Sequence, residues 1–126
     1  MKAKYIAYII AGAVTFFTPL APTLFFVGFL VLADFVTGVS KASKEKNVRS
    51  SKMIKKFYDS IGYFIGILVA QVVEIYFGDA VPIVKAVVAI IALTELQSLR
   101  ENIHALTGTD ILHPLMNIIK KKSENE

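Results

Sequence analysis

Residues 32–46 read LADFVTGVSKASKEK, and this stretch decides how the rest of the chain is interpreted. It begins near the end of an apolar segment with the composition of a membrane-buried helix, in which Asp34 is the single charge. Lysines then follow at every second or third position, starting with Lys41. A charged side chain costs at least about 2.5–3.5 kcal/mol at the centre of a membrane helix, and less near its end, where Asp34 lies.

Two interpretations of Asp34 are open. In the first, Asp34 is an interfacial carboxylate that nearby lysines neutralise; Lys41 lies seven residues on, on the same helix face. In the second, Asp34 contacts another subunit of an oligomer or lines a pore. Thr37 is a further polar residue expected at membrane depth in this segment. Gly38 is expected to loosen the helix where it leaves the bilayer.

The chain has 126 residues, enough for one domain. Hydrophobic residues make up 55% of it and charged residues 19%, whereas about 25% are charged in a typical soluble domain. A soluble chain this short has too much surface to hide so many apolar side chains, so they need lipid or other subunits. The chain has no cysteine, which excludes disulfides and thiolate sites, and its net charge is +4.

Four apolar segments predict an all-α integral membrane protein with four transmembrane helices. The spans are expected at about residues 5–18, 23–39, 57–78 and 82–99. A straight span needs about 20 residues, a length that the third and fourth segments meet. Pro19 and Pro22 predict a tight reversal between the two shorter segments, which would then form a helical hairpin. Three spans with an interfacial first helix remain the alternative.

The basic residues predict how the spans are oriented. With four spans, 13 of the 14 lysines and arginines lie on one side of the membrane and only Lys85 lies on the other. Since basic residues concentrate in cytoplasmic loops, both termini and the basic loop at 40–56 are expected in the cytoplasm. The basic residues from this loop to the start of the third span are Lys41, Lys44, Lys46, Arg49, Lys52, Lys55 and Lys56.

Residues 1–108 are therefore expected to form a membrane domain, and residues 109–126 a basic, amphipathic cytoplasmic tail. Apolar residues at helical spacing in this tail are followed by three lysines. They are Ile111, Leu112, Leu115, Ile118 and Ile119, then Lys120, Lys121 and Lys122. Such a pattern favours a short C-terminal helix on anionic lipid headgroups. A disordered tail is the alternative.

The third span carries a stripe of small residues, Gly62, Gly66 and Ala70, at four-residue spacing. Small residues in register let two helices approach closely in lipid, so this stripe predicts a packing face. Whether another span or another subunit packs there is left open by the sequence. Gln71 and Glu74 continue toward the outer end of this span as polar groups at membrane depth.

Glu95 near the end of the fourth span allows two interpretations. It belongs either to a solvated helical extension with ordinary charge pairing, or to a buried site that pairs with a basic partner from residues 41–56. Neither His104 nor His113 has metal-ligand spacing to another ligand. No catalytic motif is present either, so the chain is not expected to be an enzyme or to need a cofactor. Nucleic-acid binding is not expected, because the basic residues follow membrane topology.

The order of several short motifs resembles the phage-lysis and toxin-secretion holins. The first motif is Asp34-Phe35-Val36-Thr37-Gly38, followed by Lys41-Ala42 and Ser50-Ser51-Lys52 with a further lysine pair. The later segment Glu95-Leu96-Gln97-Ser98-Leu99-Arg100-Glu101-Asn102, with Gly108 after it, is similar to a segment of that family. The chain departs from the family at Met53-Ile54, where a glycine-containing step is common.

The resemblance implies a small protein of the bacterial cytoplasmic membrane that forms homo-oligomers and then lesions or pores. These would release a phage endolysin, or a toxin, with host lysis, and an antiholin is a further partner that it implies. The alternative is a non-lytic membrane scaffold that binds lipid headgroups or a cytoplasmic partner through its basic loop and tail. A transporter is a third class, although no internal repeat with broken helices supports it.

Overall fold

The computed structural model describes residues 2–78 and 80–125, and within these ranges the chain forms helices and turns without a strand. The all-α prediction is thus confirmed. The elements are α1 (Lys2–Phe17), the 3-10 turn η1 (Thr18–Leu20), α2 (Ala21–Lys44), α3 (Ser50–Phe77), α4 (Ile83–Thr107) and α5 (His113–Glu124).

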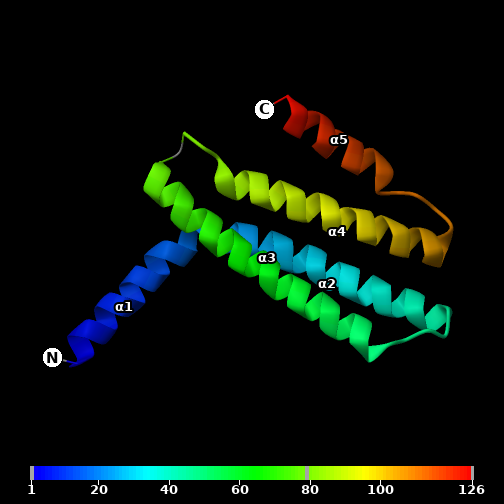
Figure 1. Ribbon diagram of the computed structural model, residues 1–126, viewed down its shortest axis with the longest axis horizontal. Coiled ribbons are helices and arrows are strands. Elements are labelled where there is room, and N and C mark those ends of the chain that lie inside the picture. Colours follow the sequence, from blue (N-terminus) through cyan, green and yellow to red (C-terminus); the bar gives the residue numbers. More distant parts are fainter. Residues whose placement is uncertain (1, 79, 126) are drawn as a thin grey trace.

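Helices α2, α3 and α4 lie side by side as a three-helix bundle, as Figure 1 shows. Helix α4 lies at its centre, because it packs against α2, α3 and α5, whereas α2 and α3 approach each other at fewer positions. The buried apolar residues form two clusters along the bundle. One contains Leu20, Val27, Ile67, Ala70, Val84 and Ile91, and the other contains Leu30, Ala92, Leu96, Leu99 and Met116.

The chain does not reverse at Pro19 and Pro22. Helices α1, η1 and α2 form one helical run from Lys2 to Lys44, bent where α1 meets α2, so α1 points away from the bundle (Figure 1). The two prolines lie in the first turns of η1 and α2, at the bend, where their missing N–H groups interrupt the hydrogen bonds of the run. The predicted hairpin of the first two segments is therefore wrong, and none of the residues of α1 is buried.

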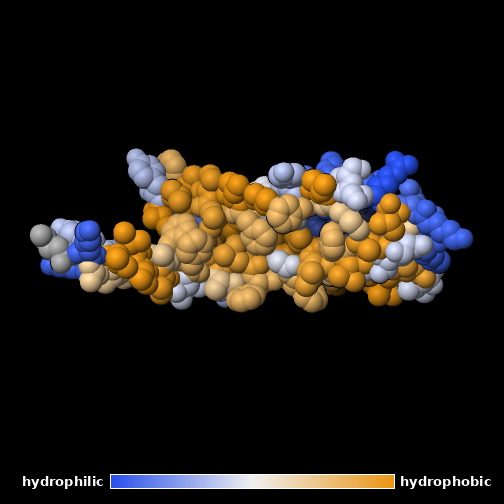
Figure 2. All heavy atoms as spheres, turned by 90° about the horizontal axis from the view of Figure 1, so that it is seen from below, coloured by the Kyte–Doolittle hydropathy of each residue, from blue (hydrophilic) through white to orange (hydrophobic). Residues whose placement is uncertain are grey.

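Within the described residues, two helical runs are long and apolar enough to cross a membrane, namely Lys2–Lys44 and Ser50–Phe77. Only 17% and 11% of their most apolar windows are buried inside the structure. The described chain exposes 9007 Å², whereas a compact soluble protein of this mass exposes about 6,700 Å². Figure 2 shows apolar side chains over most of one face, with polar groups toward its ends. Lipid is the environment that this surface fits. The number of spans stays a prediction.

The side chain of Lys44 joins the C-terminal ends of α2 and α4. The Lys44 ammonium group donates to the carbonyl oxygens of Ala105 at 3.0 Å and Leu106 at 3.5 Å, so it caps the C-terminus of α4. The turn to α3 follows, with Lys46 in the left-handed region at φ 53°. Helix α2 continues through Gly38 to Lys44, so Gly38 does not end it, and a loosening of the helix at Gly38 stays a prediction.

The tail forms a helix, so the alternative of a disordered tail is wrong. Helix α5 begins at His113 and returns along α4 (Figure 1). Met116 is buried, and Leu112 and Ile119 pack against the same apolar cluster. Part of the predicted apolar face therefore covers α4, while Ile111 and Ile118 stay exposed. Contact of this tail with lipid headgroups remains a prediction.

Candidate functional site

Asp34 lies inside the bundle, and its carboxylate joins all three helices. Its side chain is buried, and Lys56 of α3 donates from Nζ to Asp34 Oδ2. On the other side, Asn102 of α4 donates from Nδ2 to Asp34 Oδ1 at 2.9 Å. A lysine does pair with Asp34, as the first interpretation expected. The partner, however, is Lys56 of α3 and not Lys41 of the same helix. The antiparallel course of α3 beside α2 brings Lys56 back to this level.

Thr37 completes the polar contact one turn further along α2. Its hydroxyl donates to the carbonyl oxygen of Ala33 at 2.8 Å and accepts from Asn102 Nδ2 at 3.2 Å. Gly38 faces the same partners: an added Cβ would lie 3.6 Å from Asn102 Nδ2 and 3.9 Å from Lys56 Nζ. These are ordinary van der Waals distances, so alanine fits there, whereas a longer side chain would displace Lys56 or Asn102.

Glu95 is the second buried carboxylate of this region, with 6% of its surface exposed. Its side chain lines one hollow together with Tyr63, Asp34 and Lys56. A solvated position is therefore wrong for Glu95. It is buried, as the alternative expected, but among the described residues it forms no ion pair with a basic residue of 41–56, so that pairing stays a prediction. The two carboxylates and Lys56 form a polar cluster together with Thr37, Tyr63 and Asn102. Among residues 2–78 and 80–125, no group of three acidic or histidine side chains is placed to hold a metal ion.

Sequence reasoning missed Tyr63, named Asn102 only within the holin-like segment, and did not identify Lys56 as the partner of Asp34. A signal for Asn102 was present, since it follows Glu95 by seven residues, which is two helical turns and the same face. Both side chains are buried on α4, whereas Gln97 and Glu101 are exposed and joined by a hydrogen bond of 3.1 Å. The solvated helical extension that the sequence predicted is therefore present on the exposed face of α4. The opposite face, with Glu95 and Asn102, is buried instead.

The remaining predicted residues lie apart from the polar cluster. Gln71 and Glu74 are partly buried on the last turns of α3, at the opposite end of the bundle from the basic turn. Ala70 packs in the apolar core. A Cβ on Gly62 or Gly66 would meet nothing within 4 Å, so no part of the described chain packs against them. Of the small-residue stripe, Ala70 therefore packs inside the bundle, whereas Gly62 and Gly66 face open space. The role of the stripe in association stays a prediction.

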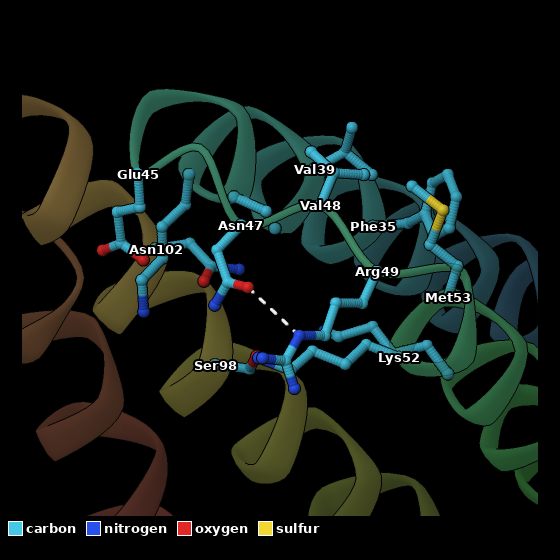
Figure 3. Close-up of a pocket in the computed structure, with 14 residues that line it drawn as sticks. Phe35, Val39, Glu45, Asn47, Val48, Arg49, Lys52, Met53, Ser98 and Asn102 are labelled. Atoms are coloured by element: carbon cyan, nitrogen blue, oxygen red, sulfur yellow. Dashed lines mark hydrogen bonds between the residues drawn. The ribbon is translucent and has the colours of Figure 1, made fainter.

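Two hollows adjoin the polar cluster. The larger, of about 660 Å³, lies between α2, α3 and α4; it has apolar walls such as Val31 and Phe64, and Asp34, Tyr63 and Glu95 also line it. The smaller, of about 200 Å³, lies at the basic turn between α2 and α3 and is shown in Figure 3. Lys56 lines both hollows, so the ion pair with Asp34 stands between them.

The profile of the bacteriophage holin family matches residues 11–123 of the chain. The chain belongs to this family. The match covers all of α2, α3 and α4 and most of α5, so it includes every residue of the polar cluster. It confirms the resemblance that the sequence motifs indicated. No curated protein and no solved structure matches this holin.

Family membership and the exposed apolar helices together make this holin a membrane protein of the phage-lysis type. The holin family is not an enzyme family. The polar cluster is therefore best considered as a group of side chains that a membrane protein holds inside a bundle, away from lipid.

Proposed function

We propose that this holin accumulates in the bacterial cytoplasmic membrane as closed bundles, which then associate into lesions that release a phage endolysin or a toxin. One observation carries the proposal. Asp34, Glu95 and Asn102 are buried inside a bundle whose outer surface is largely apolar. A single chain thus hides the groups that would be needed beside water, and exposes those that suit lipid.

Opening the bundle next to lipid is unfavourable, since each unpaired carboxylate at membrane depth costs several kcal/mol. When several chains open together, their carboxylates and Lys56 side chains face one another around water instead. The energetic barrier therefore depends on how many chains are close enough to open at once. This dependence makes local protein density the trigger, without a catalytic step.

The bundle also suggests where the membrane lies. The run Lys2–Lys44 is about 64 Å long as a straight helix, roughly twice the hydrocarbon thickness. Helix α1 therefore does not cross the membrane in line with α2. We place α2, α3 and α4 across the membrane, with α1 along its outer interface. The basic turn and the C-terminus then lie in the cytoplasm, with 11 of the 14 basic residues.

Association would use the faces that the single chain leaves open. Gly62 and Gly66 have free space above them, and small residues at this spacing let a second helix approach closely. Exposed apolar residues flank them on α3, including Ile65 and Val69. The same face on a second copy is self-complementary, which fits a homo-oligomer.

Release of solutes from vesicles tests this proposal. The purified full-length chain is reconstituted at increasing protein-to-lipid ratios into liposomes that hold both a small dye and a labelled protein of endolysin size. A lesion-forming holin releases both above a threshold density. Release of the dye alone indicates a narrow channel, and tight vesicles at every density indicate a scaffold; either result overturns the proposal.

A matched pair of variants links release to the polar cluster. Glu95→Gln changes a buried carboxylate of α4, whereas Glu101→Gln changes an exposed one six residues later on the same helix. Glu95→Gln is expected to shift the release threshold and Glu101→Gln to leave it unchanged. Equal thresholds for both variants and the unmodified chain contradict the assigned role of the cluster.

A further inference from the structure

The smaller hollow at the basic turn is the feature that the proposed function leaves without a role. It lies between the C-terminal half of α2, the turn at 45–49, the first turns of α3, and Ser98 and Asn102 of α4. In Figure 3 the side chains of Arg49 and Lys52 run across the opening toward Ser98. Its volume is about 200 Å³, which suits a small polar group rather than a whole ligand with its chains.

The charge of the lining favours an anion. Four cationic side chains border the hollow and one acidic side chain, Glu45, lies on the side away from Arg49 in Figure 3. The four are Lys41, Arg49, Lys52 and Lys56. Among the described residues Lys41, Arg49 and Lys52 make no ion pair; Arg49 donates only from Nε, to Asn47 Oδ1 at 3.1 Å.

Helix α3 adds to this positive field. It begins at Ser50, and its N-cap residue Arg49 makes no side-chain capping bond. The first N–H groups of a helix lack partners within it and carry partial positive charge, so a helix start favours a phosphate. Arg49, Lys52 and Met53 bring this first turn to the wall of the hollow.

The rest of the lining is apolar and continues onto the exposed surface of the bundle. Phe35, Val39, Val48 and Met53 line the hollow. Phe35 and Val48 are also exposed, as is Ile54 one residue beyond Met53. A ligand here meets cations at one end and an apolar helix surface beside them, which is the chemistry of a phospholipid and not of a free phosphate ion.

We propose that this hollow binds the phosphate of an anionic phospholipid of the membrane in which the holin is embedded. The proposal rests on the proposed function only in placing the basic turn at the membrane surface. Basic pockets between helices at the cytoplasmic surface are suited to such headgroups. The phosphate lies against Arg49, Lys52 and Lys41, and the acyl chains lie along Phe35 and Ile54.

Lys56 couples this site to the polar cluster. It lines the hollow and also donates to Asp34, and its side chain is 39% exposed, so it can turn toward a phosphate. Asn102 likewise lines the hollow and donates to Asp34. A bound phosphate therefore competes with Asp34 for Lys56, and lipid binding weakens the contact that holds α2 to α3.

Retention of lipid by the full-length protein tests the site. The holin is purified from membranes that contain phosphatidylglycerol and phosphatidylcholine, and bound lipid is counted by native mass spectrometry. We expect one retained phosphatidylglycerol per chain. The variant R49Q/K52Q should retain it about tenfold less, whereas K2Q/K4Q, with the same charge change on α1, should change retention less than about twofold.

Two further arms distinguish the source of the phosphate and the role of Lys56. Glycerol phosphate and inorganic phosphate, added in excess, should not displace the lipid. Asp34→Asn should increase lipid retention, because Lys56 is then released to the lipid. If circular dichroism shows that Asp34→Asn loses helix content, Lys56→Gln takes its place. Lys56→Gln should decrease lipid retention. Equal losses in the two double variants, displacement by free phosphate, or no effect at Asp34 and Lys56 would each overturn the proposal. Because retention is measured without any lesion, its failure leaves solute release, and hence the proposed function, to be judged separately.

Discussion

Asp34 shows how a carboxylate is held inside a bundle whose surface is largely apolar. Lys56 supplies the opposite charge and the Asn102 amide satisfies the second oxygen, so both carboxylate oxygens have a donor. A buried ion pair of this kind adds little net stability compared with apolar packing, but removing one partner leaves an uncompensated charge. The value of the contact therefore lies in fixing which faces of α2, α3 and α4 meet.

Replacing Asp34 by asparagine should loosen the bundle. The asparagine oxygen can still accept from Asn102, but Lys56 loses its counter-charge. Because Lys56 is partly exposed and can turn outward, we expect a loss of about 1–3 kcal/mol, less than for a fully buried pair. Thermal unfolding in detergent, followed by circular dichroism, measures this loss.

Asp59→Asn is the matched control, since Asp59 is exposed and pairs with Lys55 one turn away on the same helix. Its effect should stay within about 0.5 kcal/mol. The double variant D34N/K56M should recover part of the stability lost in Asp34→Asn, because the unpaired ammonium group is gone. Equal losses at Asp34 and Asp59 would contradict the role assigned to the cluster.

The sequence predicted the members of this cluster better than their partners. Asp34, Thr37 and Glu95 were identified because polar residues are conspicuous in apolar segments. Their partners depend on how α3 and α4 are placed beside α2, and spacing along one helix gives only neighbours such as Lys41. A sequence alone therefore indicates that Asp34 needs a partner without indicating that the partner lies 22 residues away.

Among the elements, α4 is joined by an ion pair to the loop before α5, which in the proposed arrangement lies beyond the spanning helices. Arg100 Nε lies 2.9 and 3.0 Å from the two carboxylate oxygens of Asp110, and Nη2 lies 2.8 Å from Oδ2. These contacts tie the last turns of α4 to the loop before α5. They help to hold α5 against α4, with Met116 packed beneath it.

The hydrogen bonds from the Arg100 guanidinium lower the pKa of Asp110 below its ordinary value. A lowered folded-state pKa means that the link contributes to stability above the ordinary value, about 3.9, and is lost as the pH falls through the lowered one. The contact should therefore be insensitive to pH near neutrality and break only in acid, below about pH 4.

Carboxyl chemical shifts of Asp110, followed by NMR through an acid titration, check this expectation. Arg100→Gln should return the pKa of Asp110 toward its ordinary value, whereas Lys120→Gln, which also removes one positive charge, should leave it unchanged. If Arg100→Gln leaves the pKa of Asp110 unchanged, the ion pair with Arg100 is not the cause of the lowered pKa.

The elements themselves were largely predictable, because apolar runs and helix-forming residues mark them directly. The connection between α1 and α2 was not. A proline in the first turn of a helix is compatible with a chain that bends and with one that reverses. Packing decides between the two: Leu20, between the prolines, is buried in the core, and Phe16 packs against the same cluster. A sequence alone does not show which helices these side chains will meet.

At the scale of the whole molecule, the position of α1 decides on which side of the membrane the N-terminus lies. In the proposed arrangement α1 begins outside, α2 enters the cytoplasm at the basic turn, and α3 and α4 cross once each. A reversal at Pro19 would instead bring the N-terminus to the cytoplasmic side. The two arrangements differ only in where Lys2 and Lys4 lie.

The absence of cysteine makes this difference measurable. Single cysteines at Ala3, Ser51, Val81 and Ser123 can be tested with a membrane-impermeant maleimide in intact spheroplasts. Labelling is expected at Ala3→Cys and Val81→Cys, because both lie outside, and only after permeabilisation at Ser51→Cys and Ser123→Cys. Protection of Ala3→Cys together with Ser51→Cys would restore the four-span arrangement.

The central place of α4 has a consequence for synthesis. The ribosome delivers α2 and α3 to the membrane before α4 exists, and these two helices approach each other at few positions. During that interval Asp34 can meet Lys56, but the Asn102 amide and the apolar residues of α4 that close the bundle are still missing. Each new chain therefore passes through an unfinished hairpin, and its capacity to stay closed is acquired only with the last third of translation.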